Sequence, residues 1–247
     1  MRRTLLTIAL ALFSSALFAK GTTVSFDSLA GKGSGYLVEP ETKGKHPGLI
    51  VIQEWWGLND WVQDQAERYA KEGYVALAPD LYRGKVAVTQ DEAHELMRGL
   101  PQDRAIADLK AAFRYLAERK DVDASRIGVI GWCMGGGFSL DLTLAEPKIA
   151  ATVINYGHLM ADPATVGKIH SPLLGNFGAE DRGIPPADVK AFEAALRKDN
   201  KSADIKIYDG AGHAFMNPNN KGGYVKAAAD DAQARIDKFL RESLKRS

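Results

Sequence analysis

The sequence predicts a single α/β domain in which a mainly parallel sheet carries helices on both faces. Short apolar runs of strand length alternate with segments whose apolar residues recur at helical spacing. Such alternation is typical of βαβ units, whose strands pair in parallel. The chain has 247 residues, and α/β folds reach about 250 residues as one domain.

The apolar runs predict the strands. Residues 48–53 read Gly-Leu-Ile-Val-Ile-Gln, as expected of a strand that is buried on both faces. Comparable runs lie at 74–78, 127–130, 151–155, 173–177 and 205–208. The first stretch, from Thr23 to Val38, is instead expected to form an antiparallel hairpin at an edge of the sheet.

Three segments between and after these runs keep one face apolar and predict helices. Their apolar positions are Ile106, Leu109, Phe113 and Leu116, then Val189, Phe192 and Leu196, and finally Ala232, Ile236, Phe239, Leu240 and Leu244. Thr89 followed by Glu92 has the spacing of a capping box, so another helix is expected to begin there and run toward Leu100.

The N-terminus has the pattern of a secretory signal peptide. Arg2 and Arg3 precede an uncharged segment that ends in small residues at Ala16 and Ala19. We expect residues 1–19 to be removed, with a cut after Ala16 as the alternative, and residues 20–247 to form the domain. The protein is then exported to the bacterial periplasm or secreted. The uncharged segment is shorter than the ~20 residues that span a bilayer, so no stable membrane span is expected after cleavage; a buried N-terminal helix is the alternative.

Composition excludes several classes of protein. The 32 Lys and Arg residues are balanced by 31 Asp and Glu, so no excess of positive charge predicts a nucleic-acid partner. One cysteine excludes an internal disulfide and a four-cysteine zinc site. No metal-ligand cluster or phosphate-binding loop appears, so neither a metal nor a cofactor is expected. The chain is expected to be a monomer that acts on a small molecule.

A candidate nucleophile lies in Gly131-Trp-Cys133-Met-Gly135, between a strand pattern and an apolar helix pattern. This context is typical of the nucleophile elbow, with sulfur in place of the usual serine oxygen. Met134 would open the helix, where the backbone N–H and the helix dipole stabilise negative charge. The alternative from this motif is a small buried cysteine at a glycine-rich turn.

Two further residues could complete a catalytic triad. Asp181 and His213 each follow a strand pattern, and in α/β sheets the chemistry collects at the carboxyl ends of the strands. The order Cys133, Asp181, His213 is that of the α/β-hydrolases. Glu54 ends an apolar strand, where burial would raise its pKa and suit it to accept a proton from a thiol. A simple pairing of Glu54 with an arginine is the alternative.

These blocks together resemble the dienelactone hydrolases, cysteine hydrolases of the α/β-hydrolase fold. The matching residues are Gln53-Glu54 with Gly57, Pro79-Asp-Leu-Tyr82, Gly131-Trp-Cys-Met-Gly-Gly136, Asp181 and Gly212-His-Ala-Phe215. The resemblance implies that Cys133 is the nucleophile, His213 the base and Asp181 its orienting partner. It also implies that Glu54 helps to activate the thiol, and that the backbone N–H groups of Met134 and Trp55 form the oxyanion hole.

The resemblance is weaker where the family binds the substrate carboxylate. Arg83 and Tyr156 are the candidate substrate-binding residues, but a second arginine of the family is replaced near Asn217. Arg182 is an alternative source of positive charge. Trp55, Trp56 and Trp132 suggest a bulkier, more apolar mouth, so dienelactone itself is not the expected substrate.

We therefore expect a hydrolase that cleaves small esters or lactones through a thioacyl-enzyme at Cys133. A short-chain carboxylesterase or thioesterase specificity on the same triad is the nearest alternative. Two alternatives of another class are a thiol redox protein and a binding protein without turnover.

Overall fold

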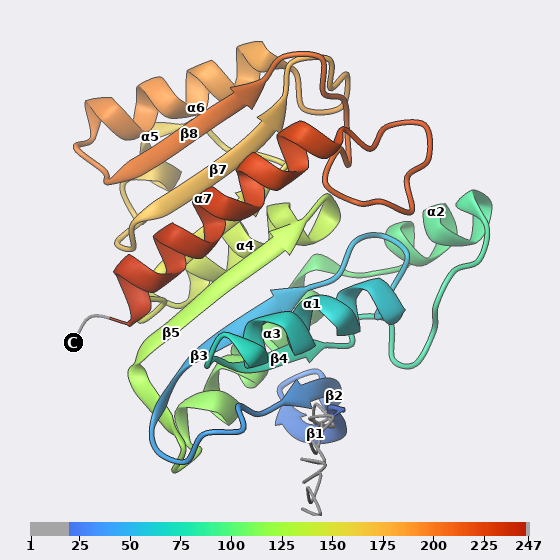
Figure 1. The fold of residues 1–247 in the computed structure, drawn as a ribbon, viewed down its shortest axis with the longest axis vertical. Helices are drawn as coiled ribbons and strands as arrows, with labels where there is room; N and C mark the ends of the chain where they lie inside the picture. The colour runs from blue at the N-terminus through green and yellow to red at the C-terminus, as the bar shows by residue number, and fades with distance from the viewer. Residues whose placement is uncertain (1–19, 246–247) are drawn as a thin grey trace, which may run out of the picture.

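The computed structural model describes residues 20–245, so the expected signal peptide at 1–19 lies outside the described residues. Residues 20–245 form one α/β domain around an eight-stranded sheet (Figure 1), with the strand order β1-β2-β4-β3-β5-β6-β7-β8. The strands β3 to β8 pair in parallel, whereas β2 pairs antiparallel with β1 on one side and with β4 on the other. The predicted fold class is confirmed.

Each apolar run of the sequence forms a strand. The strands are β1 (Thr22–Ser28), β2 (Gly31–Val38), β3 (His46–Ile52), β4 (Val75–Pro79), β5 (Val122–Trp132), β6 (Ala151–Asn155), β7 (Leu173–Gly178) and β8 (Ala203–Tyr208). The edge hairpin expected over 23–38 is β1 with β2. In β3 every residue from Pro47 to Ile52 is buried, because helices cover both faces of the sheet.

The helices of the described residues are α1 (Asp60–Lys71), α2 (Gln90–Arg98), α3 (Gln102–Ala117), α4 (Met134–Ala145), α5 (Pro163–Val166), α6 (Pro186–Lys198) and α7 (Lys226–Leu244). Side chains of α1 and α7 pack in one cluster with Leu49 and Val51 of β3. Ile50 and Ile52 point to the opposite face and pack with α3. The alternation of β3 side chains between the two faces therefore joins two layers of helices to one sheet.

Local signals set where the helices begin. Thr89 Oγ1 accepts from the backbone N–H of Glu92 at 3.3 Å, and the Glu92 carboxylate accepts from the backbone N–H of Thr89. This confirms the predicted capping box. The helix α1 was not predicted, although Asn59 caps it by accepting from the backbone N–H of Val62.

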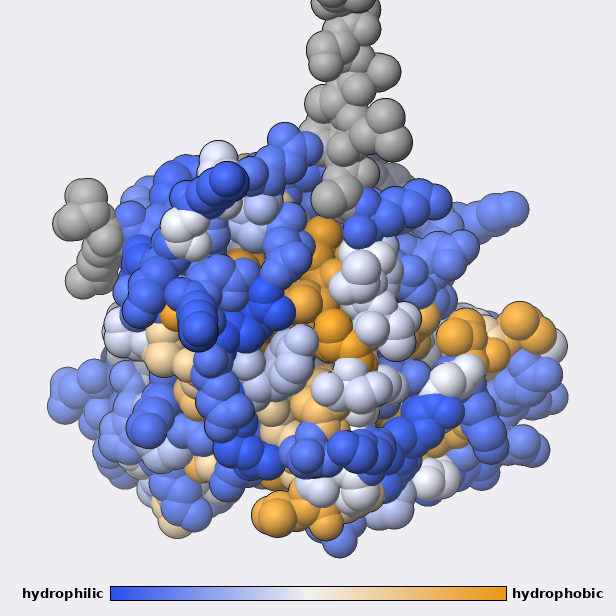
Figure 2. All heavy atoms as spheres, turned by 90° about the horizontal axis from the view of Figure 1, so that it is seen from below, coloured by the Kyte–Doolittle hydropathy of each residue, from blue (hydrophilic) through white to orange (hydrophobic). Residues whose placement is uncertain are grey.

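The arrowheads of β3, β5, β7 and β8 point to the same edge of the sheet, where α2 and the long segment between β8 and α7 also lie (Figure 1). On the face at the β1–β2 end, hydrophobic side chains form a band between hydrophilic ones (Figure 2). Leu29, in the turn between β1 and β2, is 92% exposed. Within residues 20–245 no helix has the length and apolar character needed to cross a membrane.

Glycines let three backbone segments meet around the turn that carries Cys133. A Cβ at Gly131 would lie 2.0 Å from the carbonyl oxygen of Gly135, and one at Gly135 would lie 2.4 Å from that of Gln53. A Cβ at Gly136 would lie 2.7 Å from the carbonyl oxygen of Asn155. The end of β3, the start of α4 and the end of β6 are therefore in backbone contact, which side chains at these positions would prevent.

We expect Gly131→Ala to lower the free energy of unfolding by about 2–3 kcal/mol or more, because the added methyl group overlaps backbone that cannot move aside. Gly222→Ala is the matched control, since a Cβ there meets nothing within 4 Å; it should stay within roughly 0.5 kcal/mol of the wild type. Urea denaturation measures both variants. Equal stability of the two variants would contradict the role assigned to Gly131.

Candidate active site

The structure brings Cys133, His213 and Asp181 into one hydrogen-bonded chain. His213 Nε2 lies 3.1 Å from Cys133 Sγ, and His213 Nδ1 lies 2.7 Å from Asp181 Oδ2. These residues follow β5, β8 and β7, so the shared direction of parallel strands places them at one edge of the sheet. The proximity expected from their order in the sequence is present in the fold.

Cys133 occupies a strained backbone conformation at the junction of β5 and α4. Its φ is 54° and its ψ is −119°, in a region that residues other than glycine seldom adopt. The backbone N–H of Cys133 donates to the carbonyl oxygen of Asn155 at 3.0 Å. The Asn155 side-chain amide donates to the carbonyl oxygen of Gly131 at 3.1 Å. Asn155 thus holds the turn at Gly131 and at Cys133.

His213 and Asp181 are also held by their own loops. Asp181 Oδ1 accepts from the backbone N–H groups of Gly183 and Ile184 at 2.8 and 3.0 Å. The Asn220 side chain donates to the carbonyl oxygen of His213 at 3.1 Å. The Tyr156 ring meets the imidazole edge-on, with ring centres 5.4 Å apart. The imidazole is therefore fixed by partners on both sides.

The hydrogen-bonded chain changes the protonation of its members. Burial lowers the pKa of His213, but hydrogen bonds to Asp181 and Cys133 outweigh it and raise this pKa to about 10. Burial also raises the pKa of Asp181, but hydrogen bonds from His213 and the backbone bring it below its usual range. An ionised Asp181 thus makes His213 a strong proton acceptor next to the thiol.

Glu54 is buried directly after β3 and is paired with an amide rather than with an arginine. The Asn217 side chain donates to Glu54 Oε2 at 2.6 Å. Burial raises the pKa of Glu54 to about 7, although the Asn217 hydrogen bond and the charge of His213 act to lower it. The alternative interpretation of Glu54 as an arginine partner is wrong for this chain. Asn217, noted in the sequence only as a replacement, is a direct contact of this carboxylate.

Tyr156 lies beside both Glu54 and His213. Its φ of 38° places it in the left-handed region, directly after the end of β6. Burial and the neighbouring Glu54 and Cys133 raise the pKa of its hydroxyl well above the ordinary value. Neither the Tyr156 hydroxyl nor Glu54 Oε1 has a partner with hydrogen-bond geometry. The two groups nevertheless lie close enough for each to shift the pKa of the other.

The two segments that carry the backbone groups expected to bind an oxyanion are in contact. Met134 is the first residue of α4, so its N–H has no partner within the helix. The close approach of Gly135 to Gln53 described above brings the β3 end, and with it Trp55, against the start of α4. The Tyr82 hydroxyl lies 3.3 Å from Met134 Sδ, which brings the end of the Pro79–Tyr82 block to the start of α4.

Arg83 is not brought to this cluster. Its guanidinium donates to both oxygens of Asp108 at 2.8 Å and to the carbonyl oxygens of Ala30 and Lys32. The pairing ties the β1–β2 turn to α3. The expectation that Arg83 binds substrate is therefore corrected: its Nη1 and Nη2 groups are used within the fold, because a buried Asp108 needs a cation.

The aromatic mouth of the site differs in part from the expectation. Trp55 packs edge-on against Trp56 and against His94 of α2, with centroid distances of 5.1 and 4.7 Å. Trp132 instead packs on Trp61 and is 1% exposed. It belongs to the core, because strand alternation turns it away from the neighbouring Cys133.

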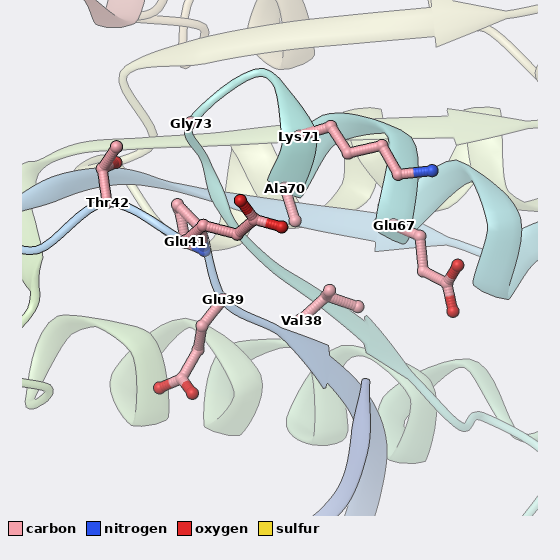
Figure 3. Close-up of a pocket in the computed structure, with 9 residues that line it drawn as sticks. Val38, Glu39, Glu41, Thr42, Glu67, Ala70, Lys71 and Gly73 are labelled. Carbon is pink, nitrogen blue, oxygen red and sulfur yellow. The ribbon is translucent and has the colours of Figure 1, made fainter. Parts of the chain in front are cut away.

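Besides a hollow of about 500 Å³ between β1 and α3, the structure has a smaller one away from the cysteine. A hollow of about 160 Å³ is lined by the segment after β2 and the C-terminal part of α1, with Glu39, Glu41 and Glu67 among its residues (Figure 3). It lies at the edge where β4 begins, opposite the cysteine. Among residues 20–245, no group of three or more His, Cys, Asp or Glu side chains is arranged to hold a metal ion.

We expect Asp181→Asn to lower the pKa of His213 by roughly 1–3 pH units, because the variant removes the carboxylate that stabilises the imidazolium. The amide oxygen introduced by this substitution can still accept from the two backbone N–H groups, so the loop should keep its shape. An NMR titration of the His213 ring protons measures the change. Glu180→Gln removes an exposed carboxylate one residue away and should leave the pKa of His213 unchanged. An equal shift of this pKa in both variants would contradict the role given to Asp181.

Glu54 should make the protein less stable as the pH rises. The folded protein binds the Glu54 proton more tightly than the unfolded chain does, because the pKa rises from 4.5 to about 7 on folding. The free energy of unfolding therefore falls between about pH 4.5 and 7, by at most on the order of 3 kcal/mol. Glu54→Gln should flatten this decline in urea denaturation, whereas the exposed Glu95→Gln should retain it. A Glu54→Gln protein that keeps the wild-type slope would contradict the burial argument.

Comparisons with known proteins identify the family of this chain. The family model described as the dienelactone hydrolase family matches residues 34–244. A protein of Synechocystis sp. with the provisional name carboxymethylenebutenolidase is 34% identical over 86% of this chain and 92% of its own length. A protein of Escherichia coli with the same provisional name is 31% identical over 88% of this chain and 86% of its own length.

A solved structure agrees with these relatives. A provisional dienelactone hydrolase from Klebsiella pneumoniae has a TM-score of 0.78 and 28% identity, and the match covers 90% of this chain and 99% of that one. The extent of the family match, from β2 to the end of α7, includes every site residue discussed above. The chain belongs to the dienelactone hydrolase family.

Proposed function

We propose that this protein hydrolyses small carboxylic esters or lactones and that Cys133 is its nucleophile. The observation that carries the proposal is the hydrogen-bonded chain from Cys133 through His213 to Asp181, with distances of 3.1 and 2.7 Å. Family membership supports a hydrolase acting on a small molecule. The geometry supports the finer assignment of a thiol nucleophile with a base and an orienting carboxylate.

In the first half of the reaction, His213 Nε2 takes the thiol proton while Cys133 Sγ attacks the carbonyl carbon. The oxygen of the tetrahedral intermediate accepts hydrogen bonds from the N–H groups of Met134 and Trp55. The bond to the leaving oxygen then breaks, and that oxygen takes the proton from His213. A thioester at Cys133 and an alcohol result; with a lactone, the alcohol stays on the acyl group.

In the second half, a water molecule attacks the thioester carbon while His213 accepts its proton. The carbon–sulfur bond breaks, and Cys133 is restored together with a free acid. Asp181 remains ionised throughout and stabilises each imidazolium that forms. Glu54 would assist when its carboxylate approaches the thiol on substrate binding, and its pKa of about 7 suits proton exchange at neutral pH.

The same site could serve a short-chain carboxylesterase or thioesterase, which differ from a lactonase only in the leaving group. Thiol redox chemistry is less well supported, since the chain has one cysteine and therefore no second thiol to resolve a sulfenate. Export remains part of the proposal: the pattern of residues 1–19 supports passage out of the cytoplasm before the protein acts.

We expect Cys133→Ala to lower kcat/KM for short p-nitrophenyl esters by at least about 10³-fold, because the nucleophile is lost. Acid-quenched wild-type protein should also carry one acyl group in intact mass spectra, and Cys133→Ala should carry none.

Ser139→Ala serves as the control, because Ser139 is the next hydroxyl along α4 and donates only to the carbonyl oxygen of Gly135. This variant should keep acylation. Hydrolysis that survives Cys133→Ala unchanged would refute the mechanism.

A further inference from the structure

The reacting centre contains more negative than positive charge. His213 contributes one positive charge, because hydrogen bonds to Asp181 and Cys133 outweigh burial and raise its pKa to about 10. Asp181 adds one negative charge, and its pKa lies below the usual range. Glu54 adds another as the pH rises past about 7. A substrate that reaches Cys133 therefore meets a site of negative net charge.

Other cations in the surrounding loops are paired with a carboxylate or exposed to solvent. Among residues 20–245, His213 supplies the single positive charge that acts on the pKa of Glu54. The Arg83 guanidinium is bound to Asp108 on both carboxylate oxygens. Lys85 and Arg182, in nearby loops, are exposed to solvent, where their fields are screened.

The groups that act on Glu54 are either neutral or, in the case of His213, also paired with Asp181. Glu54 Oε2 is bound by the Asn217 amide, which neutralises no charge. The other groups that act on it are His213 and the Tyr156 hydroxyl. The nearby cation, His213, is already paired with Asp181. A carboxylate on the substrate would therefore be repelled by Glu54, and burial makes this repulsion stronger than it would be in water.

Apolar side chains directly follow Glu54 in the chain. Trp55 and Trp56 pack together and against His94. The backbone N–H of Ala87 donates to the carbonyl oxygen of Trp56 at 2.9 Å, which holds the 83–89 segment beside them. In that segment Val86 is 46% exposed. These side chains favour uncharged groups over ions.

We propose, on the basis of the hydrolase function above, that this site selects esters and lactones that are uncharged next to the reacting carbonyl, and that it rejects those that carry a carboxylate there. Glu54, held by Asn217 rather than by a cation, is the specificity determinant. The selection strengthens as Glu54 ionises.

Two lactones of the same shape test the proposal. One is a γ-butyrolactone that carries a carboxylate on the ring carbon, and the other carries a carboxamide there. We expect kcat/KM for the carboxamide to exceed that for the carboxylate by at least about tenfold at pH 8, measured by pH-stat. The ratio should fall several-fold at pH 6, where Glu54 is mostly protonated.

Variants at position 217 test the cause. Asn217→Arg places a cation against Glu54 and should reduce the ratio at pH 8 to nearly one. Asn217→Gln keeps an amide and should keep the preference. Asn219→Arg adds the same charge at an exposed position of the same loop and should leave the ratio unchanged. Because each ratio compares two substrates of one protein, a loss of folded or active enzyme cancels.

The outcomes separate this proposal from the function on which it rests. If the Cys133→Ala variant still hydrolyses both lactones at the wild-type rate, the proposed function of Cys133 as nucleophile is overturned. Hydrolysis that depends on Cys133 but proceeds equally well with the carboxylate, at a ratio independent of pH, would overturn the selectivity alone. Equal reductions of the ratio by Asn217→Arg and Asn219→Arg would also overturn it, since the effect would then come from general surface charge.

Discussion

The site depends on backbone packed against backbone at the turn between β5 and α4. Gly131, Gly135 and Gly136 allow the start of α4 to lie against the ends of β3 and β6 with no side chain between them. That contact fixes Cys133 at a φ of 54°, a conformation that costs about 1–3 kcal/mol and persists only where its surroundings require it. The sulfur is thereby directed toward His213 rather than into the core.

Charge at this site is arranged around one imidazole. Asp181 is held by two backbone N–H groups and stabilises His213, which in turn lies 3.1 Å from the thiol. Glu54 is buried on the same side of the sheet with only an amide partner. One carboxylate is thus kept ionised by hydrogen bonds, while the other is kept near its point of titration by burial. Two groups of the same chemistry acquire different roles from their surroundings.

Family membership and local departure from the family act together in this chain. The match over residues 34–244 covers nearly the whole sheet and each of the loops that carry Cys133, Asp181 and His213. At two positions where the resemblance implied substrate-binding arginines, the side chains have other contacts: Asn217 donates to Glu54, and Arg83 is bound to Asp108. A fold can keep its reacting atoms while its charge selection changes, because the two depend on different side chains.

Strand positions, the capping box at Thr89 and the order of Cys133, Asp181 and His213 were readable from the chain, because buried strands and helix caps leave short-range patterns. The helix α1 was missed, although Asn59 offered a cap. Contacts between distant residues could not be predicted in this way. Nothing near Arg83 indicates its pairing with Asp108, and nothing near Trp132 indicates that it packs on Trp61 while Cys133 faces His213. These outcomes depend on how the strands bring remote side chains together, and that arrangement exists only once the sheet has formed.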